Sequence, residues 1–396
     1  MVIPDLASFA VGLLALVLST AVVARLPVLA RTNIPVPVIA GIGVALIVSL
    51  LRQFAGVSIQ FSGQLTNFLL LAFFTTIGLS AKFSALRAGG RPLLILCAVT
   101  VLLLVLQNIV GIAIASAFGA HPYYGLLVGS VSFVGGPGTA AAWAQEAKAA
   151  GLQHAPEVAV GAATLAVVVG AIVSGPVTDW LVRRRKLQGP AGEVAANWVS
   201  PVATTAAAPP ISTIMLVLLL IVGAVLAGDV VNQWARGAGL TLPGFLTAML
   251  AGVAITNLGD AFGARLDLAP VERSGEIALQ AFLVMYLMSL KLWTLGAAFA
   301  PLLVNVAVQV LVTVLVGTII LFRWLGRDYD AAVTVGGFLG FGLSSMPVAM
   351  ATMDSVASRH GPSPKGFLLI ALAGSFFVDL ANAFVIKAFL SLPWLQ

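Results

Sequence analysis

Charged residues are scarce in this chain. Asp, Glu, Lys and Arg make up only 9% of its 396 residues, whereas 60% are hydrophobic and the mean hydropathy is +1.08. Soluble globular proteins have about 25% charged and about 45–50% apolar residues. The composition therefore excludes a soluble protein and predicts one that lies in a membrane.

Reactive and metal-binding side chains are also few. Cys97 is the single cysteine, which leaves neither a disulfide nor a cysteine metal cluster. The three histidines, His121, His154 and His360, are expected in loops and are too scattered for a recognisable metal motif. The apolar runs contain no HExxH or GxSxG motif. We therefore predict no enzymatic activity, no organic cofactor and no nucleic-acid partner.

Long apolar runs dominate the chain instead, and most have about the 20 residues that cross a bilayer as a helix. No Lys or Arg precedes the first run, so it lacks the basic start of a secretory signal and is expected to remain as a helix. The twelve runs cover residues 6–24, 36–51, 65–81, 92–118, 122–142, 156–182, 211–231, 240–256, 276–297, 299–322, 331–353 and 366–394.

The two halves of the sequence, 1–182 and 211–396, resemble each other. Residues 183–210, which are basic and then rich in Ala, Pro and Thr, separate the halves and are predicted to be an aqueous linker. Chance alignment of Ala- and Leu-rich segments is the alternative, but a nearly constant shift that also matches lysine and proline favours an internal repeat. The matched pairs are Lys82 with Lys291 and Pro92 with Pro301 at a shift of 209, and Gly135 with Gly342 at a shift of 207.

Basic residues set the predicted topology. If all twelve runs crossed, the 20 Lys and Arg would divide evenly between the two sides, against the positive-inside bias. If runs 122–142 and 331–353 enter and return on one side, ten spans remain and fifteen basic residues face the cytoplasm. The five outside are Arg52, Lys148, Arg236, Lys291 and Lys387. The sequence therefore predicts an all-α membrane protein with both termini outside and a cytoplasmic linker. It consists of two inverted-topology repeats of five transmembrane helices plus one re-entrant hairpin each.

Glycine and proline interrupt the two predicted hairpins, about 125–145 and 333–353. The first contains VSFVGGPGTAAAW and the second contains GGFLGFGLSSMP. Non-helical backbone at membrane depth is costly unless protein, water or a ligand satisfies its polar groups. Glycine lets the backbone approach a carboxylate or a small cation, although close helix packing is the alternative reason for it. The candidates at the two tips are Gly135, Gly136, Gly138, Gly340, Gly342, Ser344, Ser345 and Thr139, the last also expected to cap the returning helix.

Several motifs in order resemble those of the bacterial sodium/glutamate symporter family. They include LAFFTTIGL (71–79), LQNIVGI (106–112), GGPGTAAAW (135–143), GFGLSSMP (340–347) and FFVDLANAFVIK (376–387). The resemblance extends from about residue 33 to the C-terminus. It implies a secondary transporter of the bacterial inner membrane that takes up L-glutamate with sodium ions. It also implies a homodimer in which the two hairpins meet at the substrate site and a transport domain moves against a dimerising scaffold.

Polar side chains within the runs provide further candidates. Asp379 and Asn382 share a helix face, and an intramembrane carboxylate indicates function, so Asp379 is the first candidate sodium ligand; a buried structural pair is the alternative. Asn108 and Thr76 are candidates for the substrate, although Thr76 can instead bond back to its own helix. The remaining sodium candidates are Asn382, Gln107 and Ser132.

The sequence departs from the family pattern at both tips. Pro137 stands where the family more usually has His in a GGHGT motif, and residues 344–348 read SSMPV where Gly-Ala-Thr-Pro-Thr is commoner. Another small amino acid or a dicarboxylate is therefore an alternative substrate. An ion channel is a further alternative, because channels also use re-entrant loops.

Overall fold

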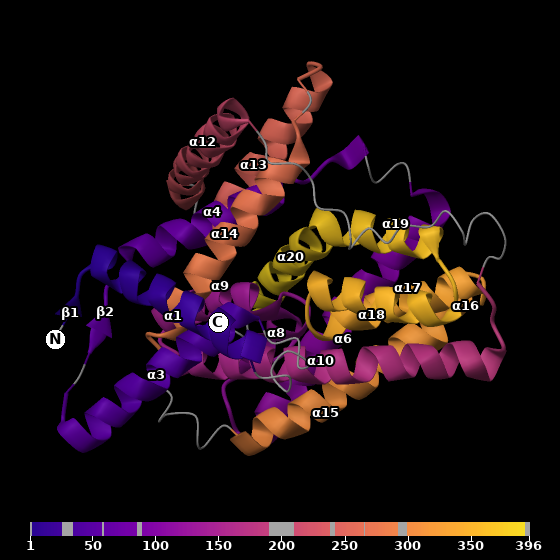
Figure 1. Cartoon of the computed structure of the whole chain (residues 1–396), viewed down its shortest axis with the longest axis horizontal. Coiled ribbons are helices and arrows are strands. Elements are labelled where there is room, and N and C mark those ends of the chain that lie inside the picture. The colour runs from indigo at the N-terminus through magenta and orange to yellow at the C-terminus, as the bar shows by residue number, and fades with distance from the viewer. Residues whose placement is uncertain are drawn as a thin grey trace. The chain divides into compact units, whose positions relative to one another are not determined.

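The chain is almost entirely helical, as the computed structural model shows (Figure 1). It describes residues 2–25, 35–57, 59–84, 89–189, 210–237, 242–264, 266–291 and 299–392. Two compact units are present: unit 1 comprises Met1–Phe83 and Ala206–Gly296, and unit 2 comprises Ser84–Thr205 and Ala297–Gln396. Each unit therefore takes one segment from each half of the sequence.

Unit 1 is built around the contact of α4 with α13 and α14. Gly78 lies directly against the backbone carbonyl of Met249, where a side chain would not fit. The Thr256 hydroxyl donates to the Leu79 carbonyl at 2.7 Å, which pairs a carbonyl at the end of α4. The helices of this unit are α1 (Asp5–Arg25), α3 (Val36–Ala55), α4 (Gln64–Leu79), α12 (Ile211–Gly237), α13 (Gly244–Ala261) and α14 (Leu268–Leu287). Two strands, β1 (Val2–Ile3) and β2 (Gln60–Phe61), pair in parallel, an element that the all-α prediction missed.

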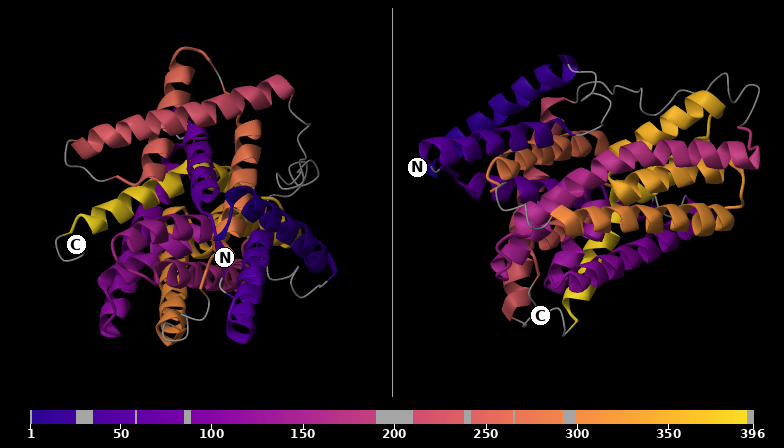
Figure 2. Two further views of the ribbon diagram at one scale, coloured as in Figure 1. Left: turned by 90° about the vertical axis from the view of Figure 1, so that its left-hand side faces the viewer. Right: turned by 90° about the horizontal axis from the view of Figure 1, so that it is seen from below.

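Unit 2 packs two broken hairpins against long helices. Its apolar core includes Phe338 and Phe341, whose rings meet edge to face at 5.4 Å. The long α10 lies beside α17 (Figures 1 and 2). The first half supplies α6 (Gly90–Ala117), α7 (Pro122–Leu127), α8 (Ser130–Phe133), α9 (Gly136–Ala149) and α10 (Ala155–Arg185). The second half supplies α15 (Phe299–Leu315), η4 (Val316–Leu321), α16 (Phe322–Trp324), α17 (Tyr329–Leu343), α18 (Met346–His360), α19 (Pro364–Leu372), η5 (Ala373–Phe377) and α20 (Val378–Leu390), where η denotes π-helix.

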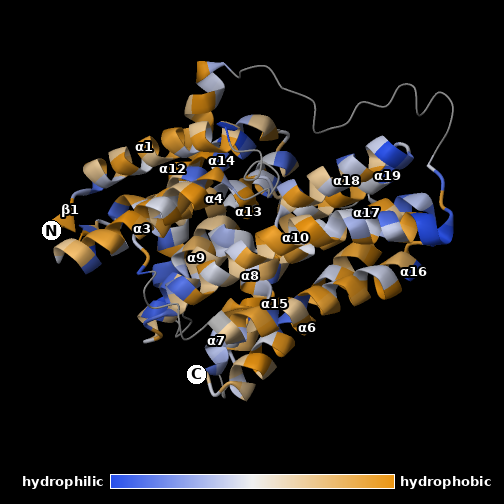
Figure 3. Ribbon diagram, turned by 60° about the horizontal axis from the view of Figure 1, so that its bottom comes forward, coloured by the Kyte–Doolittle hydropathy of each residue, from blue (hydrophilic) through white to orange (hydrophobic). Residues whose placement is uncertain are grey.

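Each of the ten predicted spans corresponds to a helix or to a continuous series of helices. Among the described residues, seven helices are long and apolar enough to cross a membrane, and the ribbon in Figure 3 is coloured by residue hydropathy. The other three spans are the shorter α4, the more polar α14, and α19–α20, which η5 interrupts. The number of crossings remains a prediction.

Three boundaries differ from the sequence expectations. The run predicted at 276–297 is α14, which begins earlier, at Leu268, because the Asp267 carboxylate caps it by accepting from the Ala269 N–H. The predicted linker began at residue 183, but α10 continues through Arg185; most of the linker lies outside the described residues. His360, expected in a loop, is the last residue of α18.

Candidate functional site

Both predicted hairpins are broken, the first within its glycine motif and the second after it. The glycines of the second motif, Gly340 and Gly342 among them, lie inside α17, so the prediction that they break the helix was wrong. In the first, α8 ends at Phe133 and α9 begins at Gly136, whose φ of +64° lies in the left-handed region that favours glycine. In the second, α17 ends at Leu343, and the extended backbone of Ser345 separates it from α18. The first hairpin thus contains α7, α8 and α9, and the second contains α17 and α18; in each, the last helix begins at a non-helical tip.

The two tips lie against each other. A Cβ atom on Gly136 would be 3.0 Å from the Ser344 carbonyl oxygen and 4.0 Å from Cβ of Ser345. The helices α9 and α18 both begin at these tips, so their N-termini lie close together. A helix N-terminus carries unpaired N–H groups and a partial positive charge. This geometry favours an anion without requiring a lysine or arginine.

A polar centre formed by α6 holds the tips. Gln107 and Asn108 are fully buried in this helix. The Gln107 Nε2 donates to the carbonyl of Gly342 at 2.8 Å, and so connects α6 to the second tip. The Asn108 Oδ1 accepts from the backbone N–H of Ser130 at 3.0 Å, and so connects the same helix to the first hairpin.

Ser130 joins α6 to α20. Its hydroxyl oxygen lies 2.9 Å from Oδ1 of Asn108 and 2.7 Å from Oδ1 of Asn382. Because the hydroxyl has one proton, it donates to only one of these oxygens at a time. The three oxygens therefore form a buried group with more acceptors than donors, the kind of surrounding that suits a small cation.

Asp379 lies in the first turn of α20, directly after the π-helix η5. Its side chain is partly buried, and within the described part of the chain it has no hydrogen-bond or ion-pair partner. Isolated π-turns within helices are frequent at functional sites because they disturb the regular backbone hydrogen bonds. The next turn of α20 places Asn382 on the same face, as the sequence predicted.

The sequence analysis missed a row of polar residues on α15. Asn305, Gln309 and Thr313 are four residues apart and all buried, so they form one stripe facing the unit's interior. The Asn305 Nδ2 donates to the Val128 carbonyl at 2.6 Å, and the Gln309 Nε2 donates to the Gln107 carbonyl at 2.8 Å. The four-residue spacing of polar side chains in an apolar run was the signal that could have revealed them.

Three buried polar atoms in this centre have no hydrogen-bond partner among the residues that the structure describes: Oε1 of Gln107, Nδ2 of Asn108 and Oε1 of Gln309. An unpaired buried polar atom costs about 1–3 kcal/mol. A bound substrate, ion or water would remove this cost. No cluster of three or more His, Cys, Asp or Glu occurs among the residues that are described, so any ion here would depend on amide, hydroxyl and carbonyl oxygens and on Asp379.

Close packing accounts for some of the predicted glycines. A Cβ on Gly135 would overlap the Thr139 side chain, and one on Gly340 would overlap the backbone of Ala349 in the neighbouring arm of the hairpin. On Gly342 it would lie 3.0 Å from Leu103. Gly138 is buried in the first turn of α9.

The remaining candidates have other partners. Thr139 is buried within α9 and does not cap it: the N-cap is Gly135, so that expectation was wrong. The Ser132 hydroxyl lies within hydrogen-bond distance of the carbonyls of Leu127 and Ala159. Thr76 belongs to unit 1, where its hydroxyl donates to the Phe73 carbonyl of its own helix at 2.7 Å.

The long apolar helices define the class of this protein, a multi-pass membrane protein. The model of the sodium/glutamate symporter family matches residues 2–362, and the chain belongs to this family. It is similar to the sodium/glutamate symporter of Haemophilus influenzae, with 38% identity over 390 residues that cover 96% of this chain and 95% of the relative. The sodium/glutamate symporter of Escherichia coli K12 is 37% identical over 399 residues, or 98% of each chain.

Proposed function

We propose that this protein takes up L-glutamate together with sodium ions by alternating access. The relatives that it matches over nearly their whole length are named sodium/glutamate symporters. The observation that carries the proposal in the structure is the meeting of Gly136 with Ser344, which brings two helix N-termini together beside a buried polar centre.

The substrate carboxylates bind at the N-termini of α9 and α18 in this proposal. Backbone N–H groups at the tips then donate hydrogen bonds to the carboxylates, and the helix dipoles favour negative charge there. Amide and hydroxyl groups orient the rest of the molecule. The proposed substrate residues, all in unit 2, are Gly135, Gly136, Gly138, Thr139, Gly340, Gly342, Ser344, Ser345 and Asn108.

Sodium binds through oxygen atoms beside this site. Asp379 supplies the negative charge, and the side-chain oxygens of Asn382 and Gln107 supply neutral ligands. The unpaired Oε1 of Gln107 supports its inclusion. Ser132 is the fourth proposed ligand. To bind sodium, its hydroxyl oxygen has to offer a lone pair while the hydroxyl donates its hydrogen bond to the Leu127 or Ala159 carbonyl.

Unit 2 is the proposed moving body, because it contains both tips, the polar centre and Asp379. Unit 1 is then the scaffold of a homodimer. In the most apolar segment of α1, 11% is buried within the chain, and in that of α12, 22% is buried. Most of the surface of these two helices is therefore available to lipid or to a second copy. Inverted repeats with two re-entrant hairpins, both termini outside and a cytoplasmic linker complete the proposed arrangement in the inner membrane.

Another small amino acid or a dicarboxylate is the second candidate substrate. Pro137 and the SSMPV sequence at 344–348 both lie at or beside the tips, where the substrate would be recognised.

Counter-flow in proteoliposomes tests this function. Liposomes loaded with unlabelled L-glutamate are expected to accumulate labelled L-glutamate, and an inward sodium gradient is expected to increase uptake. Unlabelled aspartate, glutamine and succinate added outside measure selectivity. Accumulation that is independent of sodium would contradict the proposed coupling, and flux that does not saturate with substrate would indicate a channel.

A further inference from the structure

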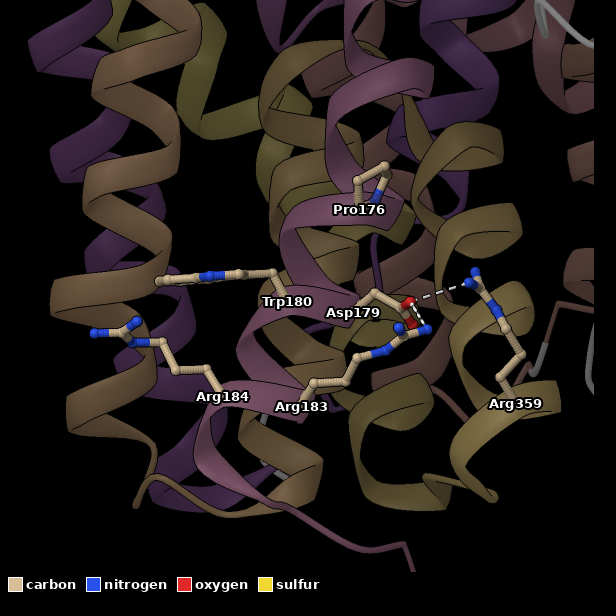
Figure 4. Close-up of a pocket in the computed structure, with 6 residues that line it drawn as sticks. All are labelled: Pro176, Asp179, Trp180, Arg183, Arg184 and Arg359. Carbon is tan, nitrogen blue, oxygen red and sulfur yellow. Dashed lines mark hydrogen bonds and ion pairs between the residues drawn. The ribbon is translucent and has the colours of Figure 1, made fainter.

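A second feature of unit 2 lies away from the tips, at the C-terminal end of α10. A cavity of about 660 Å³ opens there, lined by Pro176, Asp179, Trp180, Arg183, Arg184 and Arg359 (Figure 4). Arg359 comes from α18, and the other residues come from α10. The topology predicted from the basic residues places this end of α10 at the cytoplasmic surface.

The cavity carries excess positive charge. Three guanidinium groups and one carboxylate, that of Asp179, are among the lining residues, which leaves them a net charge of +2. Asp179 pairs with Arg183 at 2.8 Å and with Arg359 at 3.2 Å, and His360 lies 2.8 Å from its second oxygen. Asp179 therefore orients two of the arginines while neutralising only one charge.

Arg184 has no carboxylate partner among the residues that are described. Its guanidinium carbon lies 5.4 Å from the centre of the Trp180 ring (Figure 4). Stacking on an aromatic ring fixes the plane of a guanidinium group and leaves its N–H groups free to donate. Arg184 is thus held in a position from which it can bind an anion.

Apolar surface continues from the cavity along the same face of α10. Ile172, Pro176, Trp180 and Arg184 follow one another at four-residue spacing, and all four are exposed. The order is aliphatic, then aromatic, then cationic. Tryptophan favours the level of the lipid headgroups because its ring is apolar and its N–H group is polar. An arginine one turn further along the helix lies at the level of the phosphates.

We propose that this cavity is a binding site for an anionic phospholipid of the inner leaflet, such as phosphatidylglycerol. The phosphodiester binds Arg184, and the acyl chain lies along Trp180 and Ile172. Basic pockets at the cytoplasmic ends of helices suit anionic headgroups, and the apolar stripe favours a lipid over a free anion. The proposal rests on membrane insertion and on the cytoplasmic location of α10, not on the identity of the transported substrate.

Native mass spectrometry of the delipidated full-length protein tests the site. Phosphatidylglycerol and phosphatidylcholine with the same acyl chains are added at equal amounts, and the bound fraction is measured. We expect preferential binding of phosphatidylglycerol and a fall of about tenfold or more in the variant Arg184→Gln. Trp180→Ala is expected to reduce binding of both lipids, because it removes apolar contact.

The matched control is Arg185→Gln. It also removes one exposed arginine, but this residue does not line the cavity, so the variant should retain phosphatidylglycerol binding. Arg184→Gln keeps both ion pairs of Asp179, so a loss of binding in it does not come from disturbing them.

Three results would overturn the proposal. Equal binding of the two lipids would remove the headgroup preference, and an equal loss in the control would show diffuse attraction to a basic surface. If excess inorganic phosphate or L-glutamate displaces the lipid completely, the cavity binds a soluble anion instead.

Discussion

Ser130 shows how single residues hold the centre of unit 2 together. One backbone N–H, one carbonyl and one hydroxyl bond to Asn108 on α6 and to Asn382 on α20. All three side chains are almost completely buried, so each bond forms in a medium where an unpaired group is costly. A short helix of four residues is thereby fixed between two long ones.

Gly136→Ala is expected to reduce transport strongly. The left-handed φ of +64° costs about 1–2 kcal/mol for a residue with a Cβ, and the added atom would lie 3.0 Å from the Ser344 carbonyl. Sodium-driven glutamate uptake in proteoliposomes measures the effect. Gly175→Ala on α10 is the control, because a Cβ there would meet no atom within 4 Å beyond its own stretch of helix, and it should transport normally. Normal uptake by Gly136→Ala would show that the contact between the tips tolerates a Cβ atom at residue 136.

Asp379→Asn is expected to raise the sodium concentration needed for half-maximal uptake. The change removes the charge and keeps the shape, and Asp379 has no ion-pair partner in the described chain that would be left unpaired. Uptake measured over a range of sodium concentrations gives the shift, and size-exclusion chromatography checks folding. An unchanged sodium dependence would assign Asp379 a structural role.

At the scale of elements, each break in a hairpin creates a new helix N-terminus inside the unit. Glycine and proline at 135–138 end α8 and start α9, and Ser344 and Ser345 separate α17 from α18. Packing between the arms needs small residues as well, as the contact of Gly340 with Ala349 shows. Glycine thus allows a break in the first hairpin and close packing of the two arms in the second.

A disulfide between Gly136→Cys and Ser345→Cys should form readily in a Cys97→Ala background. The Cβ atoms are expected 4.0 Å apart, within the range of about 3.5–4.5 Å found in disulfides. Because a Cβ at residue 136 is itself expected to reduce transport, the measured quantity is formation of the bond and not transport. Loss of free thiols, followed by mass spectrometry of peptides, detects the bond.

The control for this cross-link is Gly175→Cys with Ser345→Cys, since the surroundings of Gly175 are open. Equal cross-linking in both pairs would mean that the tips do not adopt one defined contact.

At the scale of the whole molecule, each compact unit is assembled from both halves of the chain. Such interleaving requires the chain to pass between the units, which it does at 83–84, 205–206 and 296–297. A unit formed in this way is joined to the other by only three connections. This organisation suits a carrier in which one unit moves as a body while the other stays fixed.

Accessibility of cysteines tests the predicted orientation in the membrane. Lys148→Cys should react with an impermeant thiol reagent from outside intact cells, and Lys365→Cys should react only after the membrane is opened. Both lysines are exposed and lie in or near short hairpin elements, so they form a matched pair. The reverse pattern would contradict the ten-span topology.

The sequence by itself determined the membrane class, the apolar helices, the family and the two interrupted segments. These properties depend on local composition and on the order of residues, which the chain displays directly. It also indicated Gln107, Asn108 and Asn382, because polar residues are conspicuous in apolar runs.

Only the tertiary structure decided which of these residues meet. Ser130 is an ordinary serine in the sequence, and its role depends on Asn108, 22 residues away, and on Asn382, 252 residues away. Likewise, Gly136 and Gly340 look alike as tip glycines, yet one faces Ser344 and the other packs on Ala349. Contacts between distant segments depend on how helices pack around each other, and periodicity within one segment carries no information about its neighbour.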